Sequence, residues 1–151
     1  MVGTPTSPHT QALAARQTMN ITFKSERFIL SIDSSESEQY DQLEWIDAII
    51  SVEAECFRGN FSCNLYLEDI PDLLKKLKDL EHSIGKELEI QWGNIEDNLM
   101  LTFHMKATGQ IECSYEVSPY SIAEGPTLHG SFETDQSYLP NWISQLKKFA
   151  P

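Results

Sequence analysis

The sequence predicts an α+β protein in which a mainly antiparallel sheet of about six to eight strands is covered on one face by two amphipathic helices. From Met19 onward, apolar and polar residues alternate, which is typical of strands with one buried face. Two segments instead carry apolar residues at helical spacing, and the strands are joined by connections of hairpin length. Helices that accompany an antiparallel sheet cover one of its faces.

The first 18 residues differ in composition from the remainder. They include Thr4, Pro5, Thr6, Ser7, Pro8 and Thr10, contain no acidic residue and have only Arg16 as a full positive charge. We predict a flexible leader over residues 1–18 and one domain over residues 19–151, with Met19 as a candidate start of the folded unit. A chain of this size buries roughly 68–70% of its unfolded surface, enough for a core without metal or disulfide staples.

Four strands are expected before the first helix. The alternation places them at residues 21–23, 28–32, 46–56 and 61–67, with a polar, acidic loop between the second and third. Arg58-Gly59 predicts the hairpin turn before the fourth strand, because Gly adopts positive φ at little cost. The inward-facing residues are Ile21, Phe23, Phe28, Leu30, Ile32, Ile46, Ala48, Ile50, Val52, Ala54, Cys56, Phe61, Cys63, Leu65 and Leu67.

A first helix is predicted to begin at Asp69 and to stop near Gly85. Asp69 suits the N-cap, Pro71 is tolerated in the first turn, and Gly85 suits a C-terminal stop. The residues that recur at helical spacing are Ile70, Leu73, Leu74, Leu77 and Leu80.

The second part of the chain repeats this order. Strands are expected at residues 88–92, 99–105, 111–117 and 128–132, with a turn at Thr108-Gly109. A closing helix then carries Leu139, Trp142, Ile143, Leu146 and Phe149.

A short internal sequence similarity, called here the sequence echo, accompanies this repeated order. Gly59-Asn60-Phe61 leads into Ile70-Pro71 and a helix, as Gly130-Ser131-Phe132 leads into Leu139-Pro140 and a helix. The echo suits an internal repeat and equally suits two strand-to-helix units that have converged.

Motifs of catalysis and of cofactor binding are absent from the sequence. The seven Gly residues are scattered singly, and there is no GxGxxG, GxxxxGK[ST], GxSxG or HExxH pattern. His104 and His129 lie on the polar phase of two predicted strands; they would approach each other only if those strands were neighbours, and half-exposed sheet positions explain them as well. We therefore expect no catalytic, cofactor-binding or metal residues, and no cofactor.

Cysteine usage and hydropathy bear on the compartment. Cys56, Cys63 and Cys113 form an odd set without CxxC spacing, and each is predicted to be a buried free thiol. No stretch approaches the roughly 20 apolar residues of a membrane span, and no signal peptide is evident. A cytoplasmic location is expected.

The chain is strongly acidic. It has 11 Lys plus Arg against 23 Asp plus Glu, for a net charge of -12, which argues against direct binding of nucleic acids or anionic membranes. The excess is concentrated between Arg27 and Arg58 and from Ala107 to Leu146, where Lys and Arg are absent. If the polar strand phases share one face, that face is made negative by Asp47, Glu53, Glu55, Glu112 and Glu116.

Two interpretations of this charge compete. An acidic surface can serve solubility alone, or it can steer and block a basic protein partner such as a nuclease toxin. Aromatic residues beside the acids favour the second, since interfaces are usually anchored by such side chains, although Trp45 also suits the core. The predicted partner-binding residues are Tyr40, Asp41, Glu44, Trp45, Asp47, Glu53 and Glu55.

A succession of apolar and turn residues extends through the folded part of the chain. Its members are Trp45-Ile46, Phe57-Arg58-Gly59-Asn60-Phe61, Leu67-Glu68-Asp69-Ile70-Pro71-Asp72-Leu73, Leu77, Gly109-Gln110-Ile111, Phe132, Tyr138-Leu139 and Leu146. This succession resembles the WapI-type immunity proteins and related small bacterial proteins of unknown function. The resemblance runs from about Ile21 to Phe149 and implies an α+β protein that binds and neutralises a cognate secreted toxin, often a nuclease, in the bacterial cytoplasm. It implies no catalytic residues.

The leading hypothesis is a non-enzymatic immunity-type protein that neutralises a cognate toxin, such as a basic nuclease, through an acidic surface. The alternative is an α+β accessory or small-ligand-binding domain, which a deep apolar pocket with convergent polar groups would favour. An enzyme ranks third and would require His104, His129 and a carboxylate around one cavity.

Overall fold

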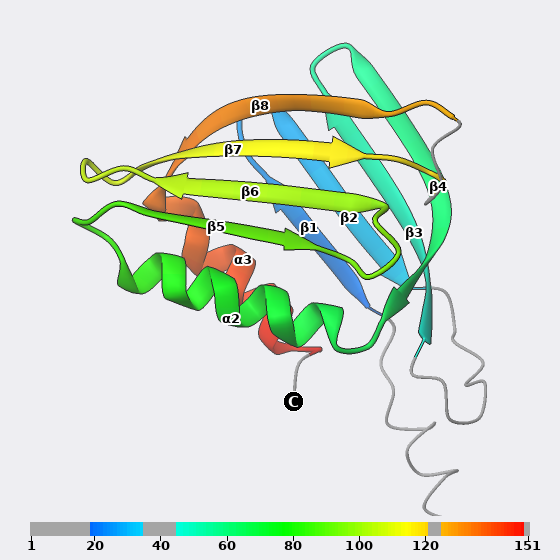
Figure 1. The fold of residues 1–151 in the computed structure, drawn as a ribbon, viewed down its shortest axis with the longest axis horizontal. Helices are drawn as coiled ribbons and strands as arrows, with labels where there is room; N and C mark the ends of the chain where they lie inside the picture. The colour runs from blue at the N-terminus through cyan, green and yellow to red at the C-terminus, as the bar shows by residue number, and fades with distance from the viewer. Residues whose placement is uncertain (1–18, 35–44, 121–124, 150–151) are drawn as a thin grey trace, which may run out of the picture.

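The computed structural model describes residues 19–34, 45–120 and 125–149. Within them, the chain forms two four-stranded antiparallel sheets and two α-helices (Figure 1). The first sheet has the order β1-β2-β3-β4 and the second has the order β5-β6-β7-β8. The strands are β1 Asn20–Lys24, β2 Phe28–Ser34, β3 Trp45–Ala54, β4 Phe57–Tyr66, β5 Leu88–Gly93, β6 Leu99–Met105, β7 Gln110–Val117 and β8 Leu128–Asp135. The helices are α2 Asp69–His82 and α3 Leu139–Lys147, the latter preceded by the 3₁₀ turn Gln136–Tyr138.

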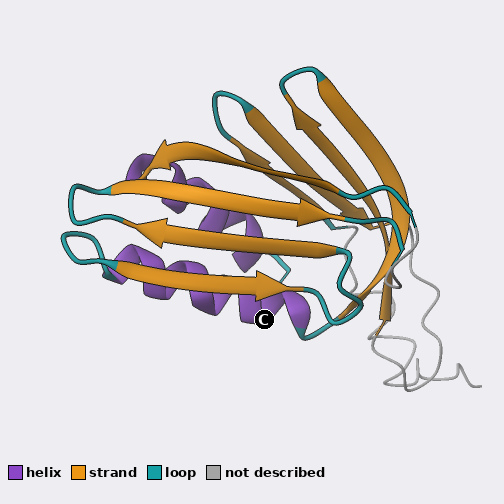
Figure 2. Cartoon of the chain, turned by 45° about the horizontal axis from the view of Figure 1, so that its top comes forward, coloured by secondary structure: helices purple, strands orange, loops and turns teal. Residues whose placement is uncertain are grey.

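The predicted α+β class and the antiparallel strands are confirmed, but the strands form two sheets instead of one. After β4 the chain enters α2, which packs against β5, so a helix and not a ladder of hydrogen bonds joins the halves. Figure 2 shows that the strands of the two sheets run in different directions. Period-2 alternation reports which residues face inward, but it does not report which strands pair.

Each half of the described chain consists of four strands followed by a helix, and the helices are exchanged between the halves. Helix α2 packs against β5, helix α3 packs against β1, and the two helices contact each other. The two segments of the sequence echo occupy equivalent places, since each leads from the fourth strand of a half into its helix. The repeated order seen in the sequence is therefore a repeat of the fold.

The two sheets share one hydrophobic core with the helices. Trp142 of α3 is 2% exposed, and its ring lies 5.7 Å from that of Phe23 in β1 and 6.2 Å from that of Phe103 in β6. Aromatic pairs of this kind contribute more stabilising free energy than their buried area alone provides, so Trp142 helps to hold the two sheets together.

The turn between β3 and β4 differs from the prediction. It consists of Glu55 and Cys56, with Glu55 at φ 56°, and Ala54 pairs with Phe57. Arg58 instead lies within β4, opposite Glu53, and their side chains form an ion pair of 3.1 Å. The prediction that the turn is formed by Arg58 and Gly59 was therefore wrong.

The cysteines are only partly where the sequence placed them. Cys113 is buried and Cys63 is half-buried, and burial raises the pKa of the Cys63 thiol to about 11. Cys56 is exposed because it belongs to the tight turn, which corrects the prediction that all three thiols are buried.

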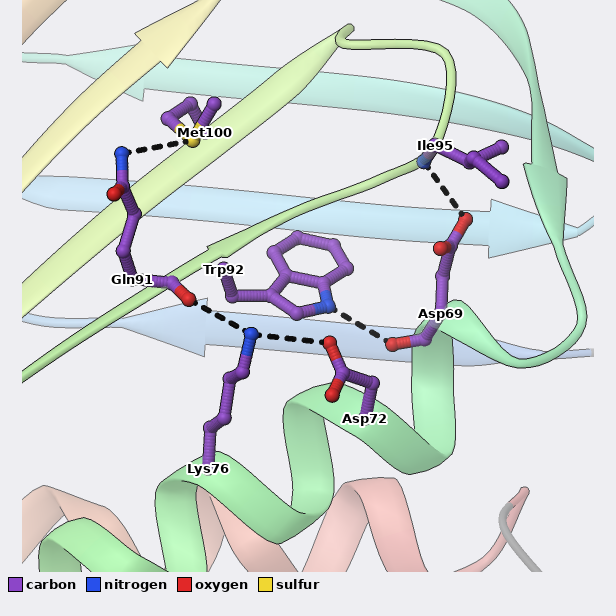
Figure 3. Close-up of polar contacts among 7 residues, drawn as sticks. All are labelled: Asp69, Asp72, Lys76, Gln91, Trp92, Ile95 and Met100. Carbon is purple, nitrogen blue, oxygen red and sulfur yellow. Dashed lines mark hydrogen bonds and ion pairs between the residues drawn. The ribbon is translucent and has the colours of Figure 1, made fainter.

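Asp69 is the first residue of α2 and not its N-cap, which is Glu68. One of its carboxylate oxygens accepts hydrogen bonds from the backbone N–H of Tyr66, at 2.9 Å, and from that of Ile95, at 3.3 Å. Its backbone oxygen accepts the indole N–H of Trp92 at 2.9 Å (Figure 3). Asp69 thus joins the start of α2 to the end of β5.

Two replacements of Asp69 should separate the contribution of its hydrogen bonds to stability from the contribution of its charge. Asp69→Ala leaves two backbone N–H groups without their acceptor and should lower the free energy of unfolding by about 1–3 kcal/mol. Asp69→Asn should lower it less, because a single amide oxygen can accept both bonds. Urea unfolding of the three proteins measures the difference, and equal losses in both variants would contradict this role.

The same variants should differ in pH dependence. Burial raises the pKa of the Asp69 carboxyl in the folded protein, so the unfolded chain releases this proton more readily. The contribution of Asp69 to stability is therefore largest below its unfolded pKa and falls as pH rises through the folded pKa. The stability of Asp69→Asn relative to the wild type should rise as pH increases above the ordinary pKa of an aspartate carboxyl, about 3.9; a constant difference would contradict the assignment.

Candidate functional site

The four predicted partner-binding residues that the structure describes do not form one patch. Trp45 and Asp47 lie at one end of β3, whereas Glu53 and Glu55 lie at the other. The eight steps along the chain from Asp47 to Glu55 would span about 26 Å in a fully extended strand. Trp45 is half-buried, with its ring 5.5 Å from that of Tyr66. The other predicted residues, Tyr40, Asp41 and Glu44, lie outside the described residues.

The acidic end of β3 is partly compensated by arginine. Glu53 pairs with Arg58 at 3.1 Å, and Glu55 pairs with Arg27 at 3.7 Å. These are the two arginines that bound the cation-free stretch of the sequence, and the hairpins bring both back onto its glutamates. Such exposed pairs contribute little stability, but they reduce the local charge.

The predicted common acidic face is divided by the separation into two sheets. Asp47 and Glu53 belong to the first sheet, whereas Glu112 and Glu116 lie on β7 of the second. The condition under which one sheet face would carry all of these carboxylates is therefore not met, because the strands form two sheets.

An open groove of about 960 Å³ lies between the turn ends of the first sheet and the strands β7 and β8 of the second. Among its lining residues, Arg27 is the one with a basic side chain. Its acidic residues are Glu26, Glu55, Glu112, Glu133 and Asp135, and its aromatic residues are Phe28, Phe57, Tyr115, Phe132 and Tyr138. This combination of carboxylates and rings makes the groove the candidate functional site.

Stacked aromatic rings form the base of the groove. The ring of Phe28 lies 4.5 Å from those of both Tyr115 and Phe132, and it is nearly parallel to that of Phe132. A side chain at Gly130 would bring its Cβ within 2.5 Å of the Tyr115 hydroxyl, so the absence of a side chain there allows the tyrosine to cross β8. Across the groove, Phe57 is 61% exposed, which is unusual for a large apolar ring.

One wall of the groove belongs to a charged row across the second sheet. The strand register aligns Glu89, His104, Glu112 and Glu133 on β5 to β8. Lys106 Nζ lies 2.8 Å from Glu112 Oε1 and 3.8 Å from Glu133 Oε1. The hydrogen bond from Lys106 lowers the pKa of Glu112, which keeps this carboxylate ionised at neutral pH.

The two histidines on predicted polar strand phases do not meet. His104 pairs in register with Glu112 and His129 pairs with Glu116, on opposite sides of β7. The two positions are four steps apart along β7, which is about 13 Å in a strand. Within residues 19–34, 45–120 and 125–149, no cluster of three or more His, Cys, Asp or Glu side chains has an arrangement that suits a metal ion.

The sequence patterns indicated only part of this groove. Glu55 was predicted to contact a partner, but Phe28, Tyr115 and Phe132 carried only a core signal, and Glu26 carried none. The pairing of Phe28 with Ala54 places the turn with Glu26 beside Glu55. Correct pairing of the second and third predicted strands would have placed Glu26 beside Glu55. The approach of β8 to these turns has no local sequence signal.

The protein is thus an α+β protein with two antiparallel sheets and an acidic groove whose base is formed by aromatic rings. The family model of the immunity protein WapI-like family matches residues 20–150. The chain therefore belongs to the WapI-like immunity protein family, which confirms the resemblance found in the sequence and supports an immunity-type function in general terms.

The other comparisons add no functional information. The search of curated proteins found no matching sequence. Among solved structures, a chain from the crystal structure of WHY1 from Arabidopsis thaliana aligns with a TM-score of 0.41 and 11% identity over 89% of each chain. Neither described helix has the length and apolar character needed to cross a membrane.

Thr134 offers a test of packing beside the groove. The residue is 8% exposed, and its hydroxyl has no hydrogen-bond partner among the described residues. Because a buried hydroxyl without a partner is costly, Thr134→Val should leave stability unchanged or raise it by about 1 kcal/mol. Thr134→Ser, which keeps the hydroxyl and removes a methyl group, should be destabilised. Thermal unfolding compares the two; a less stable valine variant would show that the hydroxyl is satisfied in solution.

Proposed function

We propose that the protein is the non-enzymatic, cytoplasmic immunity partner of a bacterial toxin, and that it neutralises the toxin by covering a basic surface. The charge of the groove carries this proposal, since five carboxylates and one arginine line it. Family membership supports a protein toxin as the partner in general terms. A basic nuclease suits this surface, because a site that attracts phosphate is attracted to carboxylates as well.

The aromatic residues of the groove would supply the binding affinity that charge alone does not provide. Steering by charge accelerates encounter, whereas affinity comes mainly from a few anchors that are desolvated on binding. Phe57 is exposed at the groove and suits such an anchor. At the opposite end of β3, Trp45 and Asp47 remain a proposed second contact area. Tyr40, Asp41 and Glu44 lie outside the described residues and remain predicted partner-binding residues.

The groove favours a protein partner over a small ligand. The alternative hypothesis required a deep apolar pocket with convergent polar groups, and this groove is instead open to solvent and rimmed by charged side chains. No observation favours that alternative specifically.

The direct test is neutralisation of the toxin. If a neighbouring gene encodes a secreted toxin, its isolated toxin domain should lose all activity when mixed with an equimolar amount of this protein. A toxin domain from that gene that stays fully active at saturating protein would overturn the proposal.

The charge mechanism has its own test. Glu55→Gln combined with Glu133→Gln should slow association with the toxin domain by about an order of magnitude at low ionic strength and flatten its salt dependence. Stopped-flow mixing measures both quantities. The matched control is Glu81→Gln combined with Glu87→Gln, which removes the same charge from residues that do not line the groove. Equal association rates for the two double variants would show that the groove carboxylates are only solvated charges.

A further inference from the structure

The four edge strands of the two sheets differ in whether a helix covers them. Helices cover β1 and β5: the Gln145 side chain accepts from the N–H of Thr22 at 2.8 Å and donates to its C=O at 2.7 Å. Lys76 similarly donates to the backbone oxygen of Gln91 at 2.9 Å (Figure 3). Unpaired edges are natural templates for another strand, and proteins commonly cover them. The remaining edges, β4 and β8, have no paired strand on their outer side within the described residues.

The outer backbone groups of β8 can be identified from two hydrogen bonds. The N–H of Gln136 donates to the C=O of Gly109, and the C=O of Gln110 accepts from the N–H of Lys106, the residue after β6. Backbone direction alternates along a strand, so every second residue of β8 turns its N–H and C=O away from β7. These residues are His129, Ser131, Glu133 and Asp135, all of them exposed.

The groove runs along this edge. Its lining includes every residue of β8 from Gly130 to Asp135, together with the turns of the first sheet. The two faces of β8 differ in chemistry: Glu133 and Asp135 lie on the exposed face, whereas Phe132 lies on the inner face against Phe28. An extended segment beside β8 would therefore meet carboxylates on one face and aromatic rings on the other.

We propose that β8 binds an extended segment of the protein partner as a fifth strand of the second sheet, and that this segment alternates basic and apolar side chains. The inference rests on the proposed function for the identity of the partner. Backbone hydrogen bonds to an edge strand give affinity, and alternate side chains give specificity. Charge distinguishes β8 from β4, because the exposed, outward residues of β4 include Arg58, Asn60 and Ser62 and no carboxylate.

Proline substitutions at the two edges provide a matched pair. Ser131→Pro removes an outward N–H of β8 and leaves the inward pairing with β7 intact. Ser62→Pro does the same on β4. The N–H of Tyr66 points away from β3 toward Asp69, and because backbone direction alternates along a strand, the N–H of Ser62, four residues earlier, points away from β3 as well. Circular dichroism and thermal unfolding check that both variants fold.

Ser131→Pro should weaken binding of the toxin domain about tenfold, the loss of roughly one backbone hydrogen bond, and Ser62→Pro should bind like the wild type. In the wild-type complex, the amides of Ser131, Glu133 and Asp135 should gain protection from hydrogen exchange. Neutralisation with no such protection would overturn strand addition and leave the proposed function standing. The exchange measurement needs no substitution, so it decides the matter even if Ser131→Pro does not fold.

A probe peptide tests the edge independently of any toxin. A capped ten-residue peptide of alternating Lys and Val should protect the same amides, whereas its Glu and Val counterpart should not. Protection by the Lys peptide supports the edge site even if the toxin domain is not neutralised. Failure of the Lys peptide to protect these amides, or equal protection by both peptides, would overturn the proposed specificity of β8.

Discussion

The exchange of helices between the two halves of the chain is the constraint on which the rest of the structure depends. Helix α2 follows the first sheet but covers β5, and α3 follows the second sheet but covers β1. Trp92 and Trp142, both almost fully buried, lie at these contacts. Neither half can bury the apolar face of its own sheet and helix without the other, so we expect the two halves to fold as one cooperative unit.

The groove is a geometric consequence of that exchange. Because the helices join the halves along β1 and β5, the opposite margins of the sheets, β4 and β8, are left without a cover in the described part of the chain. Phe28 holds the turn end of the first sheet against Tyr115 and Phe132, which fixes the distance between the turns and β8. The candidate site is thus placed by core packing, and its chemistry comes from the polar residues that remain outside that core.

Sequence patterns were sufficient for the parts of the fold that depend on local burial. Alternation located the strands, and the spacing of Leu73, Leu77 and Leu80 located a helix that buries all three. The turn at Glu55 was missed because a glycine, Gly59, gave a stronger local signal than a glutamate that adopts positive φ. Asp69 was read as a helix cap, since its bond to the N–H of Ile95 is made across 26 residues and has no local signature.

The candidate site could be predicted less well, because proximity in sequence is a poor guide to net charge at a surface. The cation-free stretch suggested an acidic patch on β3, but antiparallel pairing brings Arg58 opposite Glu53, and the turn beside β2 brings Arg27 to Glu55. Conversely, Glu133 and Asp135 join Glu26 only through the packing of the two sheets. A surplus of carboxylates along a whole chain keeps a protein soluble. At the groove, the same surplus lies beside the exposed ring of Phe57 and a strand edge that is unpaired in the described part of the chain, and we propose that this coincidence marks a binding surface.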